Sequence, residues 1–425
     1  MFYQKKIGVI IAAAVLTVAA GCSSSSKSTG GTSAATSVGA APQAGGSSRS
    51  YKVGVLTDLT GLGATNNFSF PTGVKAGVAL AAQEGYKISY VVADTTSSPT
   101  GALTAAKKLV EQDHVFAVLA DSALAFAAAN YLKSKNIPVV GVAEDGNEWI
   151  TDQNMFSVFG TQDFTKVSNV YGKLFKLLGV NNVGSIGYGI SPSSAEAAKN
   201  VAASAQAAGL KVGYLNANFP FGGTNAGPAV LAMKNAGVDG FNGSVETQTV
   251  FAIINGLRQE NINLKGALMA TGYGGDLVQG GPGAQQVAQG VYFLTSYEPV
   301  ELQTAATEKF QNALKTYAGV KGLPTFGEYN GYIAVDGFVT GLKAAGSNPT
   351  QSSFINAMLS IRSYNALGLY GSHSVGFAMD QRGQVIGADG CFWVTQYRGS
   401  TFHLVAGADP ICGQNIPGKT VSASS

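Results

Sequence analysis

The chain has 425 residues, a length that suits about two domains. Hydrophobic residues make up 45% of the chain and charged residues only 12%, so the sequence can supply large apolar cores. The net charge is +3 and the 27 basic residues form no run, which argues against a nucleic-acid-binding protein.

The N-terminus has the pattern of a bacterial targeting segment. A positively charged start precedes an apolar stretch, residues 7–20, which is too short to span a bilayer comfortably. The segment VAAGC at 18–22 resembles a lipobox, in which cleavage precedes the Cys and that Cys is then lipidated. We therefore expect a lipoprotein signal peptide over residues 1–21 and a lipid anchor on Cys22. Ordinary secretory cleavage after Ala20 or Gly21 is the alternative.

The segment that follows reads as a tether. Residues 22–50 are rich in Ser, Gly and Ala and almost uncharged, which is typical of a flexible linker. A lipid, a tether and a globular body together predict a protein held at the extracytoplasmic face of the cell membrane.

The chain has three cysteines. If Cys22 is lipidated, Cys391 and Cys412 remain, and in an oxidising compartment we expect them to form a disulfide. Two buried free thiols are the alternative.

The globular body opens with a strand, a loop and a helix. Apolar residues 53–56 predict a buried strand, 57–67 a polar, Gly-rich loop, and 73–82 an Ala-rich helix. In open α/β sheets, ligands bind in the loops past the carboxyl ends of such strands.

The same plan then repeats along the chain. A first array has strands predicted at 87–92, 115–119, 137–141 and 156–159, with helices between them. A second array has helices at 167–178, 195–208, 228–236 and 249–258 and strands at 182–186, 210–215, 240–243, 266–269 and 291–294. Helices at 305–317 and 328–345 follow, then strands at 384–386, 392–397 and 402–405. This order predicts an α/β fold of two doubly wound parallel-sheet lobes joined by a hinge.

Motifs for catalysis or cofactor binding are weak. TGLGATN at 60–66 is similar to a dinucleotide fingerprint, but the third Gly is missing and the helix begins too late. No Walker or G-x-S-x-G sequence occurs. The three His are isolated, and adjacent acids such as Glu144 and Asp145 are more typical of solvated loops than of a hydrolase. We expect no enzymatic activity, no cofactor and no metal.

Several segments carry a resemblance to a known family. They are VGVL at 53–56 with TGLGA at 60–64, DTTSSP at 94–99, AAA at 127–129 with Ile137-Pro138, and PTF at 324–326 with YIAVDG at 332–337. In this order, from Tyr51 to about Ala406, the chain resembles the type I periplasmic solute-binding proteins, specifically the leucine–isoleucine–valine-type receptors of ABC importers.

The resemblance implies an architecture and a role. Lobe 1 would be residues 51–159 with 297–375, lobe 2 would be 160–296 with 376–412, and 413–425 would be a tail. A small polar solute, such as an amino-acid-like compound, amide, amine or polyol, would be enclosed by hinge closure. The implied partners of this monomer are an ABC permease and its ATPases. A sensory receptor of the same fold and an enzyme on this scaffold are the alternatives.

The resemblance also implies a ligand site. Ser122 falls where the family places a hydroxyl that binds the ligand carboxylate, although a helix N-cap role is compatible. Asp163 matches a hinge-side Asp. The remaining candidates lie in loops at the carboxyl ends of predicted strands: Ala143, Glu144, Asp145, Tyr188, Glu246 and Tyr273.

Two features of these candidate residues argue against a standard α-amino acid as the ligand. Acids stand at 144–145 where amino-acid receptors have small residues and a Thr, and Tyr273 lies near the position of the family's ammonium-binding Glu. Because a buried unpaired charge is costly, the acids favour a ligand with an ammonium or several hydroxyls. Tyr188, Tyr273 and Trp149 would stack on an apolar or cationic part of it.

Overall fold

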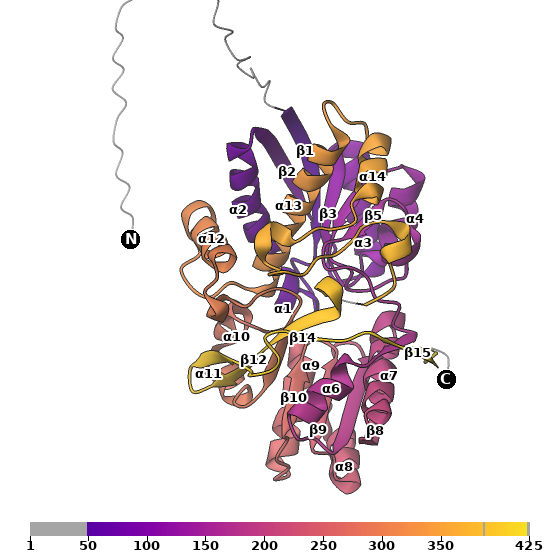
Figure 1. Cartoon of the computed structure of the whole chain (residues 1–425), viewed down its shortest axis with the longest axis vertical. Coiled ribbons are helices and arrows are strands. Elements are labelled where there is room, and N and C mark those ends of the chain that lie inside the picture. Colours follow the sequence, from indigo (N-terminus) through magenta and orange to yellow (C-terminus); the bar gives the residue numbers. More distant parts are fainter. Residues whose placement is uncertain (1–48, 386, 423–425) are drawn as a thin grey trace, which may run out of the picture. The chain divides into compact units, whose positions relative to one another are not determined.

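The computed structural model describes residues 49–385 and 387–422 (Figure 1). The expected signal peptide, the lipidation site at Cys22 and nearly all of the tether lie outside the described residues. Within the described ranges, no helix combines the length and apolar character that a bilayer crossing requires.

The first sheet has five parallel strands in the order β2-β1-β3-β4-β5. Their bounds are β1 Arg49–Thr57, β2 Tyr86–Asp94, β3 Ala117–Asp121, β4 Val139–Gly141 and β5 Met155–Ser157. Val53 and Val55 pack into one apolar core, whereas Leu56 and Val118 pack into another. The sheet is therefore buried on both faces, which explains its nearly continuous apolar strands.

Helices from two distant parts of the chain cover this sheet. They are α1 Ala64–Asn67, α2 Phe70–Gln83, α3 Pro99–Lys107, α4 Phe126–Ser134, α13 Phe326–Ala345 and α14 Gln351–Ser360. Helix α2 packs against α13, and α3 packs against α4. Figure 1 shows α13 and α14, in orange, beside the indigo and purple elements of the N-terminal part.

Glycines make the contact between α2 and α13 close. A Cβ atom on Gly73 would lie 2.1 Å from the carbonyl oxygen of Glu328, and one on Gly331 would lie 2.2 Å from that of Phe70. Only glycine permits this approach, since no larger side chain can occupy that space.

The second sheet is mixed. Its path runs β13-β12-β11-β10-β9-β7-β8, and β14 also pairs with β12. The strands are β7 Asn182–Tyr188, β8 Lys211–Phe219, β9 Gly240–Ser244, β10 Gly266–Met269, β11 Tyr292–Thr295, β12 Cys391–Arg398, β13 Thr401–Leu404 and β14 Ile411–Cys412. Strands β7 to β11 are parallel, and β12 joins β11 and β13 in antiparallel fashion. The fold is thus the expected α/β architecture, with an antiparallel hairpin at one edge.

The remaining helices complete the two lobes. Those of the second are α6 Val170–Leu177, α7 Pro192–Ala207, α8 Gly227–Ala236, α9 Thr247–Gln259, α10 Gly275–Gln279 and α11 Gly281–Val287. In the first, α5 Glu148–Thr151 packs against β5 and α12 Ala305–Ala313 against α2. Single turns of π- or 3-10 helix occur at Lys108–Gln112, Val300–Leu302, Leu314–Ala318, Ala366–Gly368, Met379–Gln381 and Ala388–Gly390.

The structure differs from the sequence-based expectation in several places. Helices α1, α5, α10, α11 and α14 were not expected. Gln384 and Val385 form no strand, because they lie between Gly383 and Gly387, whose φ angles of 66° and 81° turn the chain. Strand β15, Asn415–Thr420, lies within the expected tail and pairs with β6, Lys166–Ser168, so this segment is tied to the body.

Candidate ligand-binding cleft

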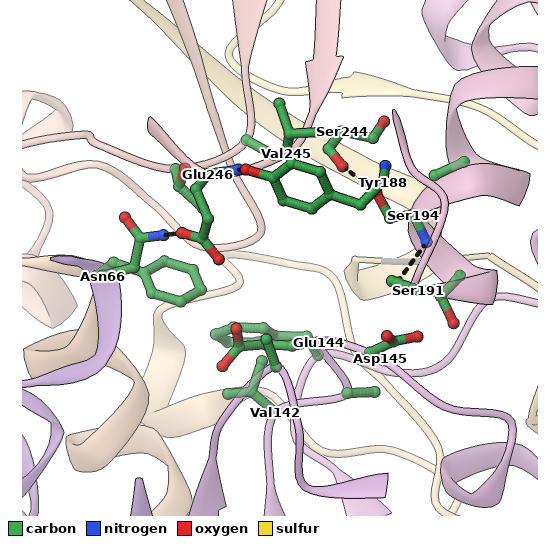
Figure 2. A pocket seen from close by; sticks show the side chains of 18 of the residues that line it. Asn66, Val142, Glu144, Asp145, Tyr188, Ser191, Ser194, Ser244, Val245 and Glu246 are labelled. Carbon is green, nitrogen blue, oxygen red and sulfur yellow. Dashed lines mark hydrogen bonds between the residues drawn. The ribbon is translucent and has the colours of Figure 1, made fainter. Parts of the chain in front are cut away.

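A cavity of about 250 Å³ lies where loops of the two sheets face each other (Figure 2). One wall comes from the loop that follows β4, including Val142, Glu144 and Asp145. The opposite wall includes Tyr188 at the end of β7 and Glu246 just after β9. The parallel strands of both sheets point their carboxyl ends at this space, which is where open α/β sheets bind ligands.

Hydrogen bonds join the two walls. The amide of Asn66, in α1, donates to the carboxylate of Glu246. The hydroxyl of Thr247 donates to Asn66 Oδ1 at 3.1 Å, and the N–H of Gly146 donates to Ser193 Oγ at 3.2 Å. These contacts bridge elements of the two lobes beside the cavity.

Glu246 is the acid of the second lobe's wall. It is 8% exposed and stands immediately before α9, where the partial positive charge of the helix N-terminus favours an anion. Its backbone N–H donates to the hydroxyl of Tyr188 at 3.2 Å. Burial, followed by the charges of Glu144 and Asp58, raises the pKa of Glu246 to about 8, although the amide of Asn66 opposes the shift.

Among the described residues, only the amide of Asn66 hydrogen-bonds the Glu246 carboxylate. Its other oxygen points into the cavity in Figure 2. Glu246 therefore has an acceptor ready for a ligand.

A second carboxylate, Asp58, lies behind the first wall and is fully buried. It accepts hydrogen bonds from the Ser122 hydroxyl at 2.6 Å, the Asn67 amide at 3.1 Å and the Ala123 N–H at 3.3 Å. The Thr95 hydroxyl donates to it as well. Sequence reasoning missed Asp58, although its place directly after β1 marks it as a residue at a strand's carboxyl end.

Asp121 and Glu144 form an acid pair next to Asp58. Burial and the neighbouring Glu144 raise the pKa of Asp121 well above its usual range, and burial with the charge of Asp58 raises the pKa of Glu144 to about 7. Asn330 donates to Asp121 at 3.0 Å, and Asn67 donates to Glu144 at 2.9 Å. The two buried carboxyls repel each other when both are charged, which favours a proton on one of them.

The cavity wall contains no basic side chain. Among the described residues that line it, none is Lys, Arg or His, while Glu144, Asp145 and Glu246 are acidic. Asp145 is only 6% exposed, and one of its oxygens accepts from the N–H of Gly146 at 2.8 Å. The site therefore concentrates acidic groups without a basic side chain beside them.

The rest of the lining is largely apolar. Leu124, Phe126 and Val142 contribute from the first lobe. Tyr188 and Phe221 contribute from the second, with ring centroids 5.0 Å apart in an edge-to-face arrangement. An aromatic or aliphatic body would bury its surface here.

Six of the eight expected ligand-site residues line the cavity: Ala143, Glu144, Asp145, Tyr188, Glu246 and Tyr273. Tyr273 also donates its hydroxyl proton to Glu301 at 2.5 Å, which fixes the ring in the wall.

The other two of the eight, Ser122 and Asp163, lie elsewhere, as does the expected stacking residue Trp149. Ser122 does not line the cavity. Its hydroxyl donates a hydrogen bond to Asp58 behind the wall. Asp163 is outside the lining; its carboxylate accepts from the Thr165 N–H at 3.1 Å. Trp149 is 1% exposed and packs in the core of the first lobe.

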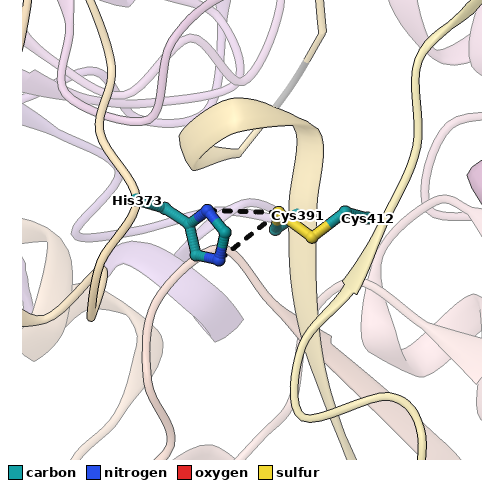
Figure 3. Close-up of side chains that lie close together, drawn as sticks. All are labelled: His373, Cys391 and Cys412. Carbon is teal, nitrogen blue, oxygen red and sulfur yellow. Dashed lines mark hydrogen bonds between the residues drawn. A yellow bond between two sulfur atoms is a disulfide. The ribbon is translucent and has the colours of Figure 1, made fainter.

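Cys391 and Cys412 are joined by a disulfide that links β12 to β14 (Figure 3). His373 Nδ1 lies 3.6 Å from Cys391 Sγ. Cysteines bonded to each other have no thiolate to offer, so this group is not a metal centre in the bonded state.

Comparison with known proteins shows which proteins this chain is similar to. Residues 50–401 match a family model described as periplasmic binding protein. No match was found among curated proteins. Leucine-binding protein LivK from Thermotoga maritima MSB8 is 19% identical, with a TM-score of 0.68, over 86% of this chain and 99% of that one.

Two further solved structures illustrate the range of relatives. LivJ from Streptococcus pneumoniae, a branched-chain amino acid transporter substrate-binding protein in complex with isoleucine, is 16% identical, with a TM-score of 0.68, over 87% of this chain and 99% of that one. An ABC transporter solute-binding protein from R. palustris in complex with benzoate is 16% identical, with a TM-score of 0.68, over 88% of this chain and 99% of that one.

At these identities the structural likeness concerns the fold alone. The family model, in contrast, matches most of the chain. The protein is therefore a member of the periplasmic binding protein family.

Proposed function

We propose that this protein is an extracytoplasmic substrate-binding lipoprotein that captures a small polar solute and delivers it, unchanged, to an ABC importer. The observation that carries the proposal is the cavity between two lobes whose walls are hydrogen-bonded across the cleft. Such a site encloses a ligand by a hinge motion and releases it by the reverse.

The chemistry of the cavity supports binding rather than catalysis. Its polar groups are carboxyls, hydroxyls and amides held by hydrogen bonds to neighbours, and its other groups are apolar. This composition is typical of small-molecule sites, in which a few placed polar groups orient a ligand within an apolar pocket.

The N-terminal sequence and the solved relatives support delivery of the solute at a membrane. The segment VAAGC at 18–22 and the Ser- and Gly-rich stretch after it would hold the binding lobes beside a permease. The solved relatives from S. pneumoniae and R. palustris are substrate-binding proteins of transporters, which agrees with this role.

A ligand screen tests the proposal. Thermal unfolding of the purified protein is followed with a library of amino acids, amides, amines, polyols and aromatic acids, because a ligand at 100 times its Kd adds about 2.7 kcal/mol to the stability. X-ray scattering then checks that the hit makes the protein more compact. The hit should be recovered unchanged after long incubation. Conversion to product, or no stabilisation by any compound, would contradict the proposal.

A further inference from the structure

We propose that the cleft selects an organic amine that has an apolar body and carries no carboxylate. This inference rests on the proposed function and names the class of solute. It follows from three features of the cleft, namely the hydrogen bonds of Asp58, the unpaired acids that face the cavity, and the apolar walls.

Asp58 accepts the hydrogen bonds from donors that could otherwise bind an anionic ligand. The hydroxyls of Ser122 and Thr95, the amide of Asn67 and the N–H of Ala123 all donate to its carboxylate. Asp58 is fully buried, so the donors are used within the protein. A carboxylate brought by a ligand would find them satisfied and would meet a like charge nearby, which is unfavourable at short range in a buried site.

Two acids from opposite walls lack a partner for part of their hydrogen-bonding capacity. Glu246 and Asp145 are both more than nine-tenths buried and both line the cavity. Among the described residues, each carboxylate has one oxygen that accepts a hydrogen bond, from Asn66 and from Gly146 respectively. Figure 2 shows the two acids on opposite sides of the open space.

Buried acids of this kind need a cation or protons. Because the described lining contains no Lys, Arg or His, the protein supplies no cation. The ligand-free site therefore keeps protons, as the raised pKa values of Glu144 and Glu246 indicate. An ammonium bound at Glu246 would replace such a proton with three N–H donors and a full positive charge.

The apolar walls define the rest of the ligand. Leu124, Phe126 and Val142 face Tyr188 and Phe221 across the cavity, which leaves an apolar space beside the acids. The aromatic rings also attract a cation through their faces. A primary amine on a branched or aromatic body fits this combination, whereas a polyol would leave the apolar surface unmatched.

Matched ligands separate amine recognition from the other possibilities. Calorimetric titration is carried out at about pH 8, where such amines, with pKa near 10.4, remain cationic. Two series share one body each: 3-methylbutylamine, leucine and 4-methylpentanoate, then 2-phenylethylamine, phenylalanine and 3-phenylpropanoate. We expect at least one amine to bind about tenfold or more tightly than the amino acid and the acid of its series.

Variants test whether the acids recognise the amine. Glu246→Gln and Asp145→Asn keep the shape of each side chain and remove its charge. Each should weaken binding of the amine by about tenfold or more. Glu308→Gln, on the exposed side of α12, is the matched control and should leave affinity unchanged. Binding to the wild type should release protons, measured in buffers of different ionisation enthalpy, and Glu246→Gln should reduce that release.

Three results would overturn the inference. Neither amine binds; the amino acid or the carboxylate of a series binds as tightly as its amine; or Glu246→Gln and Asp145→Asn both keep wild-type affinity for the amine. Tight binding of a carboxylate compound would overturn the inference while leaving solute binding in place. Failure of the whole wider screen would remove the proposed function as well.

Discussion

The side-chain amide of Asn66 donates a hydrogen bond to the carboxylate of Glu246, a residue 180 positions later in the chain and on the opposite lobe. Thr247 returns a hydrogen bond to Asn66 Oδ1 at 3.1 Å. The short helix α1 and the start of α9 are thereby clamped together at the cavity wall (Figure 2). The same amide bridges the two lobes and opposes the rise in the pKa of the cavity acid.

Replacing Asn66 with Ala should open the cleft. The change leaves the Glu246 carboxyl buried without its only hydrogen-bond donor among the described side chains, and a buried polar group left without its partner costs about 1–3 kcal/mol. We expect ligand affinity to fall by about tenfold or more, and X-ray scattering to show a less compact ligand-free protein.

Thr65→Ala is the control for this prediction. Thr65 also bridges the cleft, through a hydrogen bond of 3.0 Å to Gln248, but it is exposed. Its loss should have a much smaller effect, because exposed hydrogen bonds exchange with water. Equal losses in the two variants would mean that burial of the Asn66–Glu246 pair is unimportant.

The stability of the ligand-free protein should fall as pH rises from about 5 to about 9. Glu144 and Glu246 have folded-state pKa values of about 7 and about 8, above the value of 4.5 expected when unfolded. A raised carboxyl pKa means that the folded state holds the proton more tightly. The stabilisation is therefore complete below about pH 4.5 and is lost as pH passes the folded pKa values.

Urea titrations across this pH range measure how the free energy of unfolding changes with pH. Glu246 faces the acids Glu144 and Asp58 and the amide of Asn66, so it ionises at a cost when no ligand cation is present. Glu246→Gln should flatten the profile above about pH 6. A variant with a slope identical to that of the wild type would contradict the assignment.

Gly331→Ala should destabilise the first lobe. A Cβ atom at this position would lie 2.2 Å from the carbonyl oxygen of Phe70 and 2.6 Å from the backbone N of Val74, so α2 and α13 would have to separate. Overpacking of this kind costs about 1–3 kcal/mol or more. Denaturant unfolding measures the loss.

Gly283→Ala is the matched control. Gly283 lies in α11, and a Cβ atom there meets nothing within 4 Å. Since Ala is favoured over Gly in helices by up to about 1 kcal/mol, this substitution should be neutral or stabilising. A similar destabilisation in both variants would show that the contact between α2 and α13 is not the cause.

Removal of the disulfide should weaken the edge of the second sheet. Cys391 and Cys412 are 21 residues apart, and closing a loop of that size restricts the unfolded chain by about 3 kcal/mol in the chain-entropy model. The double variant Cys391→Ala/Cys412→Ala should lose stability of that order. Reduction of the wild type should reproduce the loss, and quantitative labelling of both thiols in the unreduced, denatured protein would contradict the bond.

The anchor is tested by Cys22→Ala. If the segment at 18–22 is a lipobox, the variant cannot be lipidated, and the protein should remain unprocessed or be released from the membrane. Fractionation with immunoblotting of cells that express both forms measures this. A mature-size variant that still partitions with membranes would rule out lipidation at Cys22.

Local sequence patterns determined the architecture. Apolar runs such as 53–56 and 115–119, each followed by a polar loop and an Ala-rich helix, specify buried parallel strands because their signals lie within a few residues of one another. The loops at 143–145 and 246 could be assigned to the ligand face for the same reason, since the carboxyl ends of parallel strands share one edge. Helix α14 was not expected, although Thr350 caps its N-terminus and Phe354, Ile355 and Met358 form its buried face.

Only the tertiary structure decided which groups are available to a ligand. Ser122 was a sound candidate by position, yet its hydroxyl is turned to Asp58, 64 residues earlier in the chain. The pairing of Asn66 with Glu246 likewise depends on loops that meet only when two sheets have formed. Hydrogen-bond partners and burial, and with them the charge of a site, are properties of atoms brought together by folding. A sequence pattern places a residue at the correct edge of a sheet but does not specify what its side chain faces.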